Sequence, residues 1–185
     1  PALQLLRQRL QERGEAFADV LKIARTHLMD AVPMTLGQSF DAFARQVGHG
    51  IDRIDATFAR LQLLAQGGTA AGTGLNAPPG FDAAFCEELG ALCGIAFAPN
   101  PSKFEGMASH DALVEVSGAL NVLAASLVKM ANDLRLLGSG PRCGLGELRI
   151  PDDGLTSSIM PGKRNPTIAE VVVQAGLQAL SLIHI

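Results

Sequence analysis

Apolar residues between Asp111 and Leu137 alternate at steps of three and four, which is the period of one face of an α-helix. A seam of this length is typical of a long helix that packs at a shallow angle against other long helices. Its other faces carry alanine and valine, so we expect the helix to be enclosed on several sides. The seam consists of Leu113, Val116, Leu120, Leu123, Leu127, Met130, Leu134 and Leu137.

The same periodicity predicts further helices from Leu3 to about Ile23, from Gln38 to Ala65 and, shorter, from about Asp82 to Leu92. A last helix begins near Pro166, because proline suits the first helical position and the preceding asparagine suits the N-cap. Loops rich in glycine and proline join these segments. The predicted fold class is therefore all-α, a bundle of long helices with functional loops at their ends.

The composition excludes some classes of protein. The 185 residues suffice for one domain, and 48% hydrophobic against 18% charged residues exclude a disordered chain. Mean hydropathy is +0.23, so we expect some apolar surface to be buried against partners. The net charge is −3 without a basic run, and no uninterrupted apolar run reaches the ~18 residues of a membrane span. We therefore expect neither a nucleic-acid partner nor a membrane partner.

The three cysteines, Cys86, Cys93 and Cys143, are odd in number and fit no metal-ligand spacing. Unpaired thiols suit a reducing compartment, so we expect a cytoplasmic protein with structural cysteines and no metal site.

Two loops carry candidate chemistry. In the first, Thr26 and His27 lie at a junction where we expect a helix to end and a proline-containing connection to follow. Taken alone, a histidine in this place is more often a capping or hydrogen-bonded residue than a catalytic one.

The second loop, residues 156–166, precedes the last predicted helix. Backbone N–H groups at a helix N-terminus favour a carboxylate, and Lys163 adds a positive charge. Ser157 and Ser158 offer hydroxyl groups, although a flexible polar loop is the commoner explanation of such a composition. Glu170, one turn into the helix, is either an orienting partner for a histidine or a solvated carboxylate.

Three motifs together resemble the fumarase/aspartase superfamily. They are RTHLMDAVPMTLGQ at 25–38, GTGLN at 72–76 and SSIMPGK-x-NP at 157–166, the last being the superfamily signature. The resemblance runs from about Leu21 to Ala179. It implies that the helices are part of the superfamily's central helical domain.

Within the superfamily the chain resembles class II fumarases most, through NPSKFE at 100–105, DALVE at 111–115 and GPRCGLGE at 140–147. AVPMT at 31–35 and EVV at 170–172 are instead similar to aspartate ammonia-lyase. Arg164 stands where class II fumarases usually have valine. With arginine in this place, the sequence KRNP at 163–166 is similar to adenylosuccinate lyase. Thr156 stands where the family usually has glycine.

The resemblance implies fumarate hydratase activity, a reaction of the tricarboxylic acid cycle. Water adds reversibly and anti across fumarate to give (S)-malate, through an aci-carboxylate intermediate and without a cofactor. By analogy Ser157 is the catalytic base, His27 is the acid acting through water, and Glu170 pairs with the histidine. The residues that match ligands of the substrate carboxylates are Thr26, Ser158, Lys163, Asn165 and, through its backbone, Arg164.

Family members are homotetramers whose active sites collect loops from three subunits. The resemblance implies that residues 1–180 are a partial central domain lacking the family's N-terminal region and C-terminal domain. It also implies that residues 181–185 are a tail of doubtful origin. We expect this piece alone to be inactive.

Other functions remain open. One is an aspartate ammonia-lyase, another is a different fumarate-releasing lyase, and a third is a non-catalytic helical assembly module. The joint presence of His27, Ser157, Lys163 and Asn165 argues against the module, because a helical bundle needs none of them.

Overall fold

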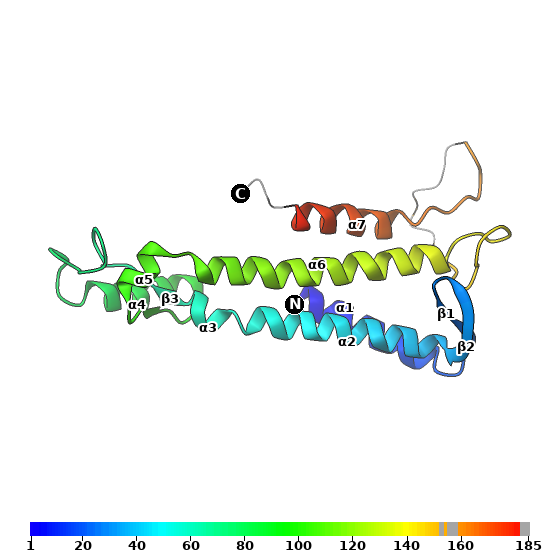
Figure 1. Ribbon diagram of the computed structural model, residues 1–185, viewed down its shortest axis with the longest axis horizontal. Helices are drawn as coiled ribbons and strands as arrows, with labels where there is room; N and C mark the ends of the chain where they lie inside the picture. Colours follow the sequence, from blue (N-terminus) through cyan, green and yellow to red (C-terminus); the bar gives the residue numbers. More distant parts are fainter. Residues whose placement is uncertain (152–153, 155–158, 182–185) are drawn as a thin grey trace. The chain divides into compact units, whose positions relative to one another are not determined.

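The computed structural model describes residues 1–151, 154 and 159–181 (Figure 1). The described chain is predominantly helical, and it falls into two compact units, Pro1–Ile51 with Leu120–Ile185 (unit 1) and Asp52–Ala119 (unit 2). The helices are α1 (Ala2–Ala16), α2 (Leu36–Asp55), α3 (Phe58–Leu61), α4 (Phe81–Cys93), α5 (Lys103–Ala108), α6 (Asp111–Leu137) and α7 (Thr167–Leu180). The strands are β1 (Leu21–Thr26), β2 (Met29–Thr35), β3 (Leu63–Leu64) and β4 (Ala98–Pro99).

The first predicted helix is wrong in its last part, so a short hairpin accompanies the helices of the predicted all-α class. α1 ends at Ala16, and β1 and β2 form an antiparallel hairpin. The carbonyl groups of Phe17 and Val20 accept hydrogen bonds from the backbone N–H groups of Gly37 and Leu36, at 2.9 and 2.8 Å. These long-range bonds draw the chain out of the helix and close the hairpin at its base.

The second predicted helix is shorter than expected. α2 ends at Asp55, and the remainder of the predicted segment is α3 followed by β3, which pairs in parallel with β4. Thr57, which is 2% exposed, donates both its hydroxyl and its backbone N–H to the Ile54 carbonyl, at 2.7 and 3.0 Å. A side chain that bonds to the nearby backbone competes with the helical ladder, which accounts for the break.

The other helices confirm their predictions closely. α6 has the predicted bounds and α4 differs by one residue at each end. α7 begins at Thr167, with Pro166 rather than Asn165 at the N-cap, so that capping prediction is wrong by one position.

The core of unit 1 lies between α1, α2 and the second half of α6. Its aromatic members meet edge to face, with ring centroids 5.3 Å apart for Phe17–Phe40 and 5.9 Å for Phe40–Phe43. A Cβ on Gly37 would lie 2.5 Å from the Gly14 carbonyl oxygen, so α2 can begin against the end of α1 only with glycine there. The buried members are Leu10, Leu36, Phe40, Phe43, Ala44, Val47 and Met130.

α6 is less enclosed than its sequence predicts. Leu113 is 59% exposed and Val114 is 69% exposed, and the buried residues of the helix are Leu123, Ala124, Met130 and Ala131. By length and composition alone α6 is also apolar enough to cross a membrane, a criterion that core helices of soluble proteins meet as well. Within this chain the helix leaves much of its apolar surface uncovered.

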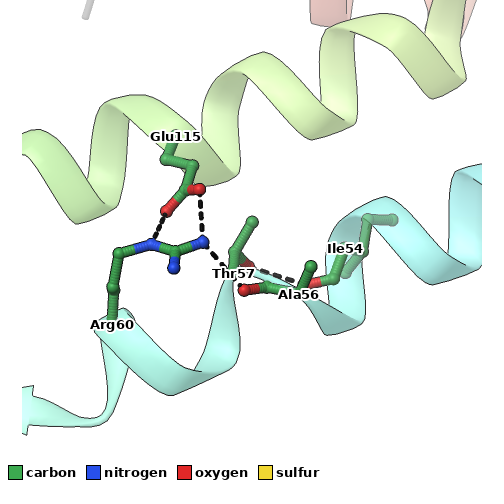
Figure 2. Close-up of polar contacts among 5 residues, drawn as sticks. All are labelled: Ile54, Ala56, Thr57, Arg60 and Glu115. Atoms are coloured by element: carbon green, nitrogen blue, oxygen red, sulfur yellow. Dashed lines mark hydrogen bonds and ion pairs between the residues drawn. The ribbon is translucent and has the colours of Figure 1, made fainter.

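In unit 2, a bidentate ion pair joins α3 to α6 (Figure 2). Arg60 donates from Nε and Nη2 to the two Glu115 carboxylate oxygens, at 2.6 and 2.5 Å, and Nη2 also donates to the Ala56 carbonyl at 2.9 Å. These hydrogen bonds lower the pKa of Glu115 below its ordinary 4.5.

We expect Glu115→Gln to lower the melting temperature slightly at neutral pH, because both side chains are partly exposed and such pairs contribute little. A carboxyl group with a lowered pKa in the folded state stabilises above its unfolded pKa, and this contribution disappears as the pH falls through the folded value. The difference in melting temperature between variant and wild type should therefore shrink below pH 4.5. A difference that stays constant down to acid pH would contradict this account of the pair.

Candidate active site

His27 lies at the tip of the β1–β2 hairpin. Thr26 pairs with Met29, so His27 and Leu28 alone form the turn, with φ angles of 53° and 63°. Two-residue hairpins favour this left-handed turn, but usually with asparagine or glycine. For residues with larger side chains such backbone costs about 1–3 kcal/mol each, and strain of this kind gathers at functional sites. The turn leaves the imidazole exposed at the tip.

A cluster of three charged residues, Lys22, Arg25 and Glu147, lies behind this tip. Lys22 Nζ is 3.1 Å and the Arg25 guanidinium is 2.5 Å from the Glu147 carboxylate, one on each oxygen. Burial raises the pKa of Glu147, but the ion pairs with Arg25 and Lys22 outweigh it and the net shift is downward. The carboxylate is therefore charged at neutral pH, and the cluster has a surplus of one positive charge.

The signature loop is described only in its second half. The Lys163 N–H donates to the Met160 carbonyl at 3.2 Å, and Gly162 has φ 79°. Proline at 161 followed by glycine at positive φ is the pattern of a type II turn. Lys163 and Arg164 are exposed and Asn165 is half-buried, just before α7. The predicted base Ser157 and ligand Ser158 lie outside the described residues.

Glu170 lies in the first turn of α7, as expected, but its partner here is not a histidine. Its Oε1 is 3.5 Å from the Arg135 guanidinium of α6. Among the described residues, no hydrogen bond or ion pair joins His27 to Lys163, Asn165 or Glu170. Within one chain, the described site residues thus fall into two groups, one at the tip of the hairpin and one at the start of α7.

Sequence reasoning assigned no role to Lys22, Arg25 or Glu147. Glu147 counted only as the last residue of a motif, since nothing local indicates that it meets two cations more than 120 residues earlier in the chain. Lys103 in unit 2 forms an ion pair with Asp82, with its Nζ 2.6 Å from the carboxylate.

The cavities of unit 2 lie apart from the predicted site residues. Two open cavities of about 370 and 380 Å³ lie in unit 2 beside the Gly67–Asn76 loop, and none of the predicted site residues lines them. The described residues contain no group of three potential metal ligands among His, Cys, Asp and Glu.

Comparison with known proteins agrees with the motifs. A family model for lyases matches residues 1–180. Mitochondrial fumarate hydratase from Rhizopus oryzae is 53% identical over 97% of this chain and 36% of its own length. Class II fumarate hydratase from Caulobacter vibrioides is 52% identical over 96% of this chain and 38% of its own length. The chain thus spans a little over a third of these curated relatives.

A class II fumarase from Schistosoma mansoni has the same fold over the region that it shares with this chain. The TM-score is 0.93 at 39% sequence identity, covering 97% of this chain and 41% of the other. The family model, the relatives and the fold all agree with the resemblance that the three motifs indicated, and we conclude that this chain belongs to the lyase family.

Proposed function

We propose that the whole protein is a fumarate hydratase, which adds water reversibly to fumarate to give (S)-malate. The observation that carries the proposal is His27, presented at the tip of a strained hairpin within a chain that is about half identical to fumarate hydratases. The substrate is a small dicarboxylate, and the proposed reaction belongs to the tricarboxylic acid cycle.

The proposed roles follow the chemistry of the reaction. In the direction of fumarate formation, Ser157 removes the proton beside one carboxylate and His27, through water, protonates the departing hydroxide. Serine is a weak base at its ordinary pKa, so nearby N–H donors and Lys163 must favour its alkoxide. The same positive field stabilises the aci-carboxylate, whose charge is the main electrostatic demand of the reaction. Thr26, Ser158, Lys163, Asn165 and the Arg164 backbone bind the substrate carboxylates.

The proposal includes a homotetramer. Among the described residues, no hydrogen bond or ion pair joins His27 to Glu170, whose partner is Arg135, and in this proposal Glu170 meets a histidine across a subunit boundary. Exposed apolar side chains on α7, such as Ile168 at 68% and Val171 at 55%, are suited to burial between subunits. In this proposal the 1–180 segment is a partial central domain, inactive alone, and the enzyme works in the cytoplasm.

The test is an assay of the full-length protein. We expect fumarate absorbance to fall without ammonium and malate to accumulate. Loss that requires ammonium would instead make the protein an aspartate ammonia-lyase. Fumarate unchanged under both conditions would overturn the proposal and leave another lyase, with Arg164 indicating a larger substrate, or the assembly module.

A further inference from the structure

The cluster of Lys22, Arg25 and Glu147 is one of the most buried sets of charges in the described chain. Their side chains are 11%, 20% and 19% exposed, whereas Arg60 and Glu115 are 56% and 39% exposed. Removing charges from water is costly unless each finds a partner, and here one carboxylate serves two cations. Each of the two cations therefore has a charged partner where its contact with water is reduced.

The cluster joins the hairpin to a part of unit 1 whose position is fixed. The residue after Glu147 is Leu148, which packs against the hydrophobic core, and its N–H donates to the Leu137 carbonyl at 3.0 Å. The Gly146 N–H donates to the Ser139 carbonyl at 2.8 Å. Glu147 is thus held from both sides by the end of α6 and by the core.

Apart from the two backbone hydrogen bonds at its base, the hairpin itself has little other support. It is a sheet of two strands, which is marginally stable alone in water. Its large apolar side chains face outward, with Leu21 at 78% and Met29 at 70% exposed. Two residues of β2 also lie opposite the single Ala24, an irregularity that increases the local twist of the strands.

We propose that Glu147 is a positioning residue that, through Lys22 and Arg25, fixes the hairpin so that His27 and Thr26 face the substrate in one orientation. This inference rests on the proposed function, because it assigns His27 the role of the acid. Glu147 does not touch the substrate. It acts through β1, whose last residues are Arg25 and Thr26, directly before the histidine.

The test compares Glu147→Gln with Glu115→Gln in the full-length protein, since both remove the charge of an ion-paired carboxylate. For Glu147→Gln we expect kcat to fall by about 10- to 100-fold, because a displacement of about 1 Å can cost 10²-fold. KM should rise as well, because Thr26, a proposed ligand of the substrate, moves with the hairpin. Amide hydrogen exchange of residues 21–35 should become severalfold faster. Glu115→Gln should change neither kcat nor exchange in the hairpin.

Two milder variants keep the test decisive if Glu147→Gln does not fold. Glu147→Asp retains the charge and should recover part of kcat, and Lys22→Met leaves the Arg25–Glu147 bond and should give a smaller loss. Wild-type kcat and exchange in all the variants that fold would overturn the proposal, as would faster exchange with unchanged kcat. Without hydratase activity in the wild type, the proposed function fails, and the exchange data alone decide whether Glu147 anchors the hairpin.

Discussion

Ser157→Ala should reduce hydration of fumarate by the full-length protein by about 10²- to 10⁴-fold, the range that a positioned general base contributes. Alanine has no hydroxyl group and cannot take the proton. KM should change much less than kcat, because the lost interaction concerns proton transfer rather than binding of the carboxylates. Steady-state kinetics at several fumarate concentrations would measure both.

The control is Thr156→Ala in the same loop, a residue to which the family pattern assigns no role. It should retain activity close to that of the wild type. Circular dichroism and sedimentation should show the same helix content and the same oligomer for both variants. Turnover by Ser157→Ala near the wild-type rate would refute the assignment of the base and leave Lys163 or His27 to be tested in its place.

The sequence indicates the long helices well because their signal is local and repeated. The seam of α6 runs without interruption from Leu113 to Leu137, nearly the whole length of the 27-residue helix, so the period alone indicates where the helix lies. α2 ends earlier than its apolar pattern predicts, since a hydroxyl at Thr57 outweighs a pattern that continues past it. Periodicity shows where a helix can form, and single polar groups decide where it ends.

The hairpin could not be predicted in the same way. Its turn, His27-Leu28, has none of the glycine or asparagine that normally indicates a two-residue hairpin. What holds it are backbone bonds from residues 17 and 20 to residues 36 and 37, and the contact with Glu147, which is distant in the sequence. The motif therefore identified Thr26 and His27 as candidate residues. That they lie on a β-hairpin depends on contacts between residues distant in the sequence, which a local pattern does not indicate.

Phe43→Ala should cost about 3–5 kcal/mol of unfolding free energy, the range for removing a large aromatic side chain from a well-packed core. Phe43 is 4% exposed, meets the Phe40 ring edge to face and lies beneath the Lys129 ammonium, 5.2 Å from the ring centroid. Its removal leaves a cavity between α2 and α6. Urea unfolding at one fixed protein concentration would measure the change, because oligomers gain apparent stability with concentration.

The matched variant Phe43→Leu keeps most of the volume and should cost less than about 1.5 kcal/mol of unfolding free energy.

Phe43→Ala also distinguishes a loss of stability from a loss of catalysis. The same core holds Leu148, and through it Glu147, but Phe43 itself lies on α2 and not on the hairpin. Phe43→Ala should therefore lower the stability while the folded fraction retains its kcat, in contrast to Glu147→Gln. Equal costs for alanine and leucine would contradict the view that the volume lost at Phe43 determines the loss of stability.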